Sequence, residues 1–295
     1  MDIALALGGG GSRGYSHIGV LRRLEQEGYR VRAVAGTSAG GIVGAVYAAG
    51  YSPDEMETLF TKVDQSKLFG RSAKEGPGLL GLAGAAKVLE DLFGERTFAD
   101  LRIPCALTAV DIKSASEVVL SEGRVVDAVL ATIALPGIFP PKEFKKHQLV
   151  DGAVLDPVPV SVARLLAPRL PVAAVILDSP SKTGVGFTQI QLPVPVPAPI
   201  VERLVRTRIA QAFSIFLQSV DIGSRKLAEL RLREDNPEVI LRPDVGDIGL
   251  LDTVDVHKVI RLGEQAVDAM LPELKRATAW PNRLRRKYFP SWQEK

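Results

Sequence analysis

Short apolar runs alternate along the chain with segments whose apolar positions recur at helical spacing. Such runs predict buried strands over residues 3–7, 31–35, 105–111, 117–120, 144–150, 172–178 and 239–241. Helical spacing predicts helices over 15–27, 39–50, 85–93, 125–133, 160–166 and 254–271, and over 201–232 with a candidate break at Gly223. Strands that alternate with helices indicate βαβ units, so the pattern predicts an α/β fold with a mostly parallel central sheet.

Capping residues, glycines and prolines refine the predicted element boundaries. Ser52, Pro53 and Glu55 are typical of a helix start, with Ser52 as the N-cap and Glu55 completing a capping box. Residues 64–84 are rich in glycine and predict a loop, and the prolines of 179–200 exclude a regular helix there. We therefore expect a core over 1–178, a proline-rich lid or linker and helical part of the same domain over 179–278, and a tail over 279–295.

Charge and composition narrow the class of protein. The 295 residues carry 37 Lys and Arg against 34 Asp and Glu, a net charge of +3. The tail accounts for +4, from Arg283, Arg285, Arg286, Lys287 and Lys295 against Glu294, so the body is close to neutral. A nucleic-acid partner is not expected, because such proteins carry a basic face on their folded body. No apolar run reaches 18 residues and the N-terminus lacks a basic region, which favours a cytoplasmic location.

A glycine-rich segment between the first strand and the first helix is the strongest local signal. Its backbone N–H groups would point into one concavity beside a helix N-terminus, which suits an anion. The spacing matches a dinucleotide-binding fingerprint, but that site also needs an acidic residue about 20 positions on, and none occurs from Val31 to Tyr51. We therefore interpret the segment as an oxyanion hole for acyl transfer, formed by Gly9, Gly10, Gly11, Ser12, Arg13 and Gly14.

A G-x-S-x-G motif after the second strand predicts a nucleophile elbow. Gly36 and Gly40 flank Ser38 in a strand-to-helix step too tight for larger neighbours. The same pattern occurs around Ser12, but Ser12 lies among consecutive glycines, whereas a sharp step would hold the Ser38 hydroxyl rigidly. Ser38 is therefore the predicted nucleophile, and two merely structural turns remain the alternative.

The serine needs a base, and two kinds are available. A histidine triad could use only His17, His147 or His257, and none stands where such a histidine is expected. Asp151 ends an apolar run, and a carboxylate at a strand end points into the ligand crevice of an open sheet. Partial burial would raise its pKa and make it a better base. Asp-Gly between two short strands is also a favoured hairpin turn, which is the structural alternative.

Four blocks in order make the chain similar to the patatin-like phospholipases, over residues 2–178. The blocks are Gly9–Gly14, Gly36–Gly40, Ala131–Pro141 and Asp151–Ala153. The resemblance implies a three-layer α/β/α sandwich and a Ser–Asp dyad of Ser38 and Asp151. It also implies an oxyanion hole of the Gly10 and Gly11 N–H groups, with no metal and no cofactor. Ala153 stands where many relatives have glycine.

The same resemblance implies a phospholipid or lysophospholipid substrate and hydrolysis of its acyl ester. An acyltransferase using the same acyl-enzyme, or a non-catalytic regulator that binds acyl chains, are the alternatives. The tail mixes aromatic and cationic residues, which suits peripheral contact with an anionic lipid surface as well as a solvated or subunit-contacting segment. The sequence does not predict an oligomeric state.

Overall fold

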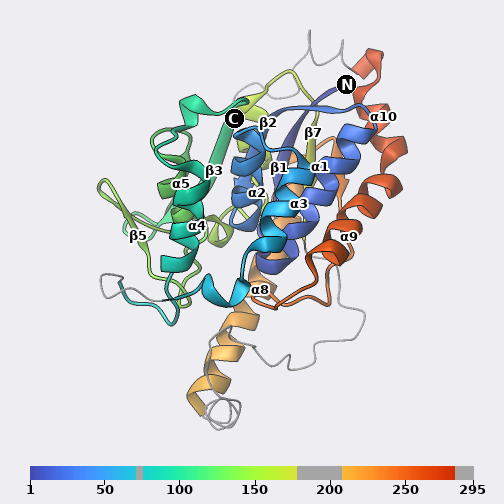
Figure 1. Ribbon diagram of the computed structural model, residues 1–295. Helices are drawn as coiled ribbons and strands as arrows, with labels where there is room; N and C mark the ends of the chain where they lie inside the picture. The colour runs from blue at the N-terminus through green and yellow to red at the C-terminus, as the bar shows by residue number, and fades with distance from the viewer. Residues whose placement is uncertain (71–75, 178–207, 283–295) are drawn as a thin grey trace.

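The computed structural model describes residues 1–70, 76–177 and 208–282, in which helices flank both faces of a central sheet (Figure 1). These residues form an eight-stranded sheet in the order β5-β6-β3-β2-β1-β7-β8, with β4 pairing β3 outside this path. The strands are β1 (Asp2–Leu7), β2 (Arg30–Thr37), β3 (Cys105–Asp111), β4 (Ser116–Leu120), β5 (Lys142–Phe144), β6 (His147–Asp151), β7 (Val172–Val175) and β8 (Val239–Leu241).

The sheet is parallel in its centre and antiparallel at one end. β1 pairs with β2 and β7 in parallel, and β2–β3 and β7–β8 are parallel as well. β4 and β6 run antiparallel to β3, and β5 runs antiparallel to β6. The predicted three-layer α/β/α sandwich with a mostly parallel sheet is confirmed.

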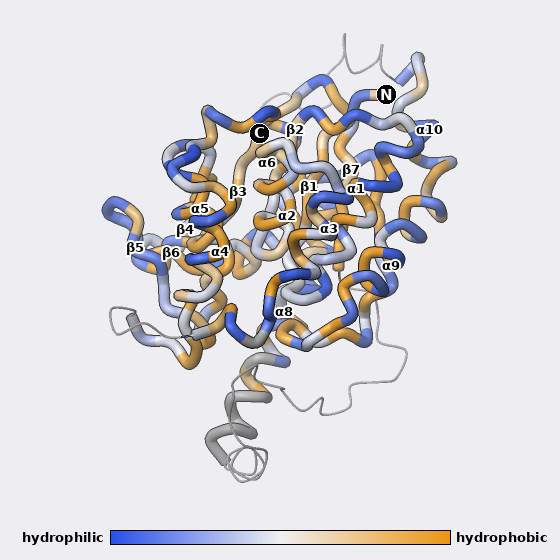
Figure 2. Tube along the Cα trace, viewed as in Figure 1, coloured by the Kyte–Doolittle hydropathy of each residue, from blue (hydrophilic) through white to orange (hydrophobic). Residues whose placement is uncertain are grey.

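The alternation of large and small residues along β1 determines what packs on each face of the sheet. Ile3, Leu5 and Leu7 join one core with residues of α1 (Ser16–Gln26), α2 (Ala39–Ala48) and α9 (Val256–Ala269). Ala4 and Ala6 face the second core, with α6 (Val160–Leu166) and α8 (Arg208–Asp235). Successive strand side chains point to opposite faces, and the alanines allow α6 to lie close to the strands. Hydrophobic residues accordingly concentrate along the inner strands and on inward helix faces (Figure 2).

The remaining helices cover the ends of the sheet. α4 (Ala83–Phe93) and α5 (Val125–Thr132) lie beside β3 and the antiparallel strands, and α10 (Leu271–Thr278) follows α9 at the other end (Figure 1). α3 (Pro53–Lys62) begins with the predicted capping box, because Ser52 and Glu55 bond each other's backbone N–H groups. Short 3-10 turns are η1 (Gly11–Tyr15), η2 (Gln65–Lys67), η3 (Phe98–Asp100) and η4 (Gly152–Val154).

Three boundaries predicted from the sequence were wrong. The strand expected over 144–150 is two strands, β5 and β6, because the chain turns at Lys145, where φ is 54°. α8 continues through Gly223, since an exposed helical glycine costs only about 1 kcal/mol relative to alanine. The helix expected over 254–271 ends at Ala269 and restarts as α10, with Pro272 in its first turn.

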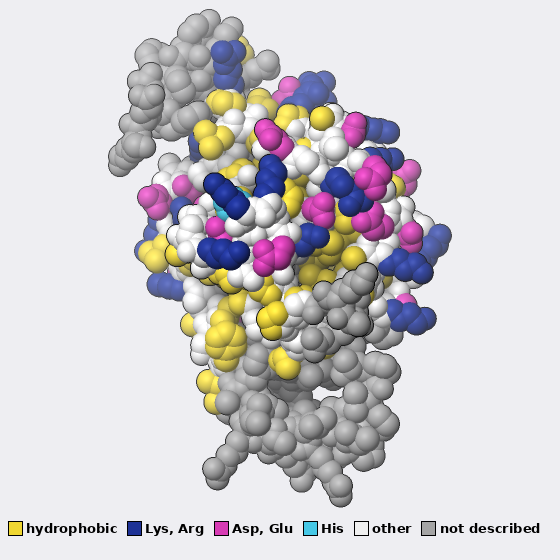
Figure 3. Space-filling view, turned by 90° about the vertical axis from the view of Figure 1, so that its left-hand side faces the viewer, with side chains coloured by type: hydrophobic (Ala, Val, Ile, Leu, Met, Phe, Trp, Pro, Cys, Tyr) yellow, Lys and Arg dark blue, Asp and Glu magenta, His cyan; other side chains and the backbone are white. Residues whose placement is uncertain are grey.

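Several predicted features lie outside the described residues. They are the lid or linker at 179–200, the helical residues 201–207, and 283–295 of the tail. None of the helices in the described ranges is long and apolar enough to cross a membrane. On the face shown in Figure 3, Lys and Arg side chains are interspersed with Asp and Glu. Arg124 forms ion pairs with Glu90 and Glu95.

Candidate active site

The pairing of β3 brings residues 38 and 151 together. β4 pairs with Leu107–Asp111 along one edge of β3, so β2 and β6 must share the other edge. On that edge Thr37 pairs with Thr108, and Asp151 pairs with Ala109. The parallel β2 therefore ends where the antiparallel β6 also ends. Ser38, the residue after β2, emerges beside Asp151 although 113 positions separate them in the chain.

Ser38 occupies the strained turn predicted for a nucleophile elbow. Its φ of 54° and ψ of −123° are rare for a residue with a side chain, and such conformations persist only when the surroundings impose them. The glycines on both sides allow this turn. A Cβ on Gly36 would lie 2.5 Å from the Gly40 carbonyl oxygen, and a Cβ on Gly40 would lie 2.2 Å from the Leu7 carbonyl oxygen.

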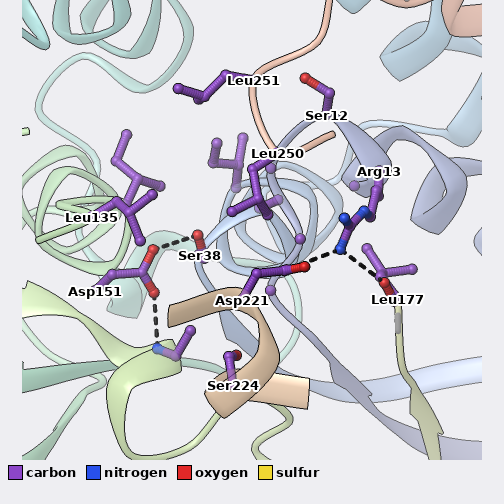
Figure 4. Close-up of a pocket in the computed structure, with 18 of the residues that line it drawn as sticks. Ser12, Arg13, Ser38, Leu135, Asp151, Leu177, Asp221, Ser224, Leu250 and Leu251 are labelled. Carbon is purple, nitrogen blue, oxygen red and sulfur yellow. Dashed lines mark hydrogen bonds and ion pairs between the residues drawn. The ribbon is translucent and has the colours of Figure 1, made fainter. Parts of the chain in front are cut away.

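Ser38 and Asp151 form a direct hydrogen bond. The Ser38 hydroxyl donates to Asp151 Oδ2 over 2.6 Å, and Asp151 Oδ1 accepts from the Ala153 N–H over 2.9 Å (Figure 4). Asp151 is only 2% exposed. Burial raises its pKa to about 6, against the lowering effect of these two hydrogen bonds. A carboxylate with such a pKa is ionised at neutral pH and is well suited to accept the proton of a serine.

The glycine loop lies against the elbow. A Cβ on Gly9 would lie 3.2 Å from the Ser38 Cβ, and a Cβ on Gly14 would lie 2.5 Å from the Ala39 Cβ. The N–H of Gly9 donates to Pro157 O, that of Ser12 to Leu250 O, and that of Arg13 to Gly10 O.

The N–H groups of Gly10 and Gly11 donate to no backbone carbonyl among the described residues. They are the two donors that the resemblance implied for the oxyanion hole, whereas the other three N–H groups of Gly9–Arg13 are bonded to backbone carbonyls. The guanidinium of Arg13 is engaged away from Ser38, with Ile248, Leu177 and Asp221.

The three histidines are engaged elsewhere. His17 is buried in α1, where Nε2 bonds Gly8 O, and burial lowers its pKa to about 4. His147 Nδ1 bonds Asp111 over 2.9 Å, and His257 of α9 bonds Glu57 of α3. The described residues contain no group of three or more His, Cys, Asp or Glu placed to hold a metal ion.

A cavity of ≈ 660 Å³ opens above Ser38 and Asp151. Its lining includes the glycine loop and parts of α3, α4 and α8. One part is hydrophobic and includes Phe60, Leu68, Phe69, Leu89, Ile133 and Phe139. Another part carries polar and charged side chains, among them Ser12, Arg13, Asp221, Ser224, Arg225 and Asp252. The cavity can thus accommodate a molecule with an apolar chain and a polar end.

Sequence reasoning missed the groups that hold Ser38 and Asp151 in place. The Ser38 N–H donates to Thr132 Oγ1 over 2.9 Å, and that hydroxyl donates to Thr108 O over 2.6 Å. The Asp151 N–H donates to Ala134 O. Thr132 and Ala134 belong to the Ala131–Pro141 block, so their position in that block was the available signal. Thr108 belongs to none of the four blocks, so the sequence offered no signal for it.

A second buried carboxyl lies five residues after Asp151. Asp156 is fully buried, its carbonyl accepts the Thr37 hydroxyl, and burial raises its pKa to about 7, with nearby Glu117 adding to the effect and Arg231 opposing it. The folded protein therefore loses stability as pH rises from about 4, where the unfolded carboxyl ionises, to about 7.

Asp156→Asn is expected to remove this loss. The free energy of unfolding should exceed that of the wild type by about 2 kcal/mol at pH 8 and match it near pH 4. Urea denaturation at both pH values measures the difference, with the exposed Asp91→Asn as control. Equal stability of Asp156→Asn and wild type at pH 8 would contradict the burial argument.

Comparison with known proteins places this geometry in a family. The family model described as patatin-like phospholipase matches residues 5–164. An uncharacterized NTE family protein of Mycobacterium tuberculosis is 36% identical over 162 residues, covering 54% of this chain and 44% of the relative. Human patatin-like phospholipase domain-containing protein 6 is 33% identical over 178 residues, covering 58% of this chain and 13% of the relative. The chain thus spans less than half the length of either relative.

A solved structure agrees with the fold. VipD from Legionella pneumophila superposes with a TM-score of 0.57 at 12% identity, covering 92% of this chain and 66% of VipD. The matched segment 5–164 contains the glycine loop, Ser38 and Asp151, and it is more than half of the 295 residues. This chain belongs to the patatin-like phospholipase family.

Proposed function

We propose that this protein is a serine lipid acyl hydrolase of the phospholipase A or lysophospholipase type. The observation that carries the proposal is the 2.6 Å hydrogen bond between Ser38 and Asp151 beside a largely hydrophobic cavity. Membership of the patatin-like phospholipase family supports a lipid ester as the substrate. The hydrophobic part of the cavity would hold the acyl chain, and the polar part would face the alcohol portion.

In the proposed reaction, Ser38 Oγ attacks the ester carbonyl carbon while Asp151 accepts its proton. Negative charge develops on the carbonyl oxygen, and the Gly10 and Gly11 N–H groups stabilise it. Collapse of this intermediate expels the alcohol, which takes the proton from Asp151 and leaves an acyl-Ser38 ester. Asp151 then deprotonates a water molecule that attacks this ester and releases the fatty acid. The steps need no metal and no cofactor.

A fluorophosphonate probe tests the proposal, because it modifies only an activated serine hydroxyl. We expect a single adduct, assigned by peptide mass spectrometry to Ser38 rather than Ser12. An unlabelled protein, or an adduct at Ser12, would overturn the proposed site.

Product analysis then tests the reaction type. With a phospholipid or lysophospholipid as substrate, we expect free fatty acid whether or not an acceptor alcohol is added. Transfer of the acyl group to the acceptor in place of water would identify a transferase. Labelling at Ser38 without turnover of any lipid ester would contradict the hydrolase and favour an acyl-binding regulator.

A further inference from the structure

Arg13, a residue of the glycine loop, points away from Ser38 and links three other parts of the chain. Its Nε donates to Ile248 O over 2.6 Å, and its Nη1 lies 3.5 Å from Leu177 O and 3.3 Å from Asp221 Oδ1 (Figure 4). The side chain is 5% exposed. A guanidinium offers five donors in a rigid fork, so one side chain can hold several acceptors in a fixed arrangement.

Two of these partners, Leu177 and Ile248, belong to segments that pack against the glycine loop. A Cβ on Gly10 would lie 2.8 Å from the Leu177 side chain, and a Cβ on Gly11 would lie 1.9 Å from Leu250 O. The same Leu250 oxygen accepts the Ser12 N–H over 2.9 Å. The glycine loop is therefore packed between Leu177 and the segment around Leu250. Arg13 bonds both of them, through Leu177 O and Ile248 O.

Asp221 of α8 supplies the negative charge for this arrangement. Burial lowers the pKa of Arg13, and the attraction of Asp221 opposes that effect. Asp221 also pairs with Arg225 over 2.7 Å, so one carboxylate holds two guanidinium groups. Without it, Arg13 would be a buried cation beside a second cation, a strongly unfavourable situation.

We propose that Asp221 is a positioning residue, which acts through Arg13 to hold the Gly10 and Gly11 N–H groups in register with the carbonyl oxygen of the substrate. This inference rests on the proposed function, because it concerns the oxyanion hole of that reaction. It also means that α8 and the segment around Leu250, both beyond the family match at 5–164, complete the active site.

The Asp221→Asn variant tests the proposal. With p-nitrophenyl acetate as substrate, kcat should fall about 10- to 100-fold and KM should change less than about twofold, because donors displaced by a fraction of an ångström stabilise the transition state less. The rate of fluorophosphonate labelling at Ser38 should fall by the same factor. The acid limb of the pH profile should stay where it is in the wild type, because Asp221 pairs with Arg13 and Arg225 and not with Asp151.

Glu238→Gln is the matched control. Arg164 bonds Glu238 and the carbonyls of Asp235 and Asn236, so this pair resembles Arg13–Asp221 in its contacts but lies outside the cavity lining. We expect lower stability and an unchanged kcat. A similar loss of kcat in both variants, or Asp221→Asn labelling as fast as the wild type, would overturn the positioning role.

A double-mutant cycle tests whether Asp221 acts through Arg13. The rate losses of Asp221→Asn and Arg13→Lys should be less than multiplicative when combined, and Asp221→Glu should recover most of the wild-type rate. Fully multiplicative losses, or no recovery with Asp221→Glu, would overturn the inference. Absence of Ser38 labelling in the wild type would instead overturn the proposed function, and the inference with it.

Discussion

Replacing Ser38 with Ala or Asp151 with Asn is expected to lower kcat for a lipid ester on the order of 10⁴-fold. Each change removes one half of the Ser38–Asp151 hydrogen bond, which is the proposed nucleophile–base contact, and residues that act as one unit show losses of this size. The double variant should be little worse than either single variant. Ser121→Ala and Asp91→Asn, both exposed and remote in sequence from the motifs, are the controls. Full activity of Asp151→Asn would end the dyad proposal.

The pH profile should identify Asp151 as the group that must lose its proton. Because burial raises its pKa to about 6, kcat/KM should fall about tenfold for each pH unit below that value. The residual rate of Asp151→Asn should lack this limb. A limb near pH 4 in the wild type would mean that Asp151 is solvated rather than buried.

Stability measurements separate loss of chemistry from loss of fold. The free energy of unfolding of the wild type falls as pH rises from about 4 to about 6 and Asp151 ionises, because its folded pKa lies above the reference value of 3.8. The Asn side chain does not ionise. Asp151→Asn should therefore be at least as stable as the wild type at pH 8, while it is inactive.

The sequence predicted the parts of the site that depend on local chemistry. Gly36, Ser38 and Gly40 occupy alternate positions of one five-residue turn, whose steric demands are visible in the residue types alone. Asp151 was harder, because Asp-Gly also suits a hairpin turn, and only its place among four ordered blocks favoured the catalytic interpretation. In the structure it ends β6 and caps the 3-10 turn that follows.

Contacts made by the backbone between distant segments could not be predicted in this way. Leu250 contributes a carbonyl oxygen to Ser12, and any residue type could do the same. Asp221 is one of several charged residues on an amphipathic helix, and nothing in its neighbours marks it as the partner of Arg13, 208 positions earlier. The β5–β6 turn was missed for a related reason, since Lys145 adopts a positive φ without being glycine.

Gly40→Ala is expected to lower the free energy of unfolding by about 3 kcal/mol or more and to abolish activity. The added methyl would lie 2.2 Å from Leu7 O, 2.5 Å from Leu7 C and 2.7 Å from Gly8 O. All three are backbone atoms, so no side-chain rotation relieves the overlap, which places the cost at or above the upper end of the usual range for overpacking, about 1–3 kcal/mol. Relief requires α2 to move away from β1, which separates Ser38 from the glycine loop.

Gly223→Ala is the matched control for stability, because a Cβ there meets nothing within 4 Å and the position lies inside α8. It should stabilise the protein by up to about 1 kcal/mol, through the higher helix propensity of alanine. Thermal and urea denaturation of the two variants at pH 7 gives the comparison. A Gly40→Ala protein as stable as the wild type would show that α2 and β1 are not held in contact, and the close approach that positions Ser38 against the glycine loop would lose its physical basis.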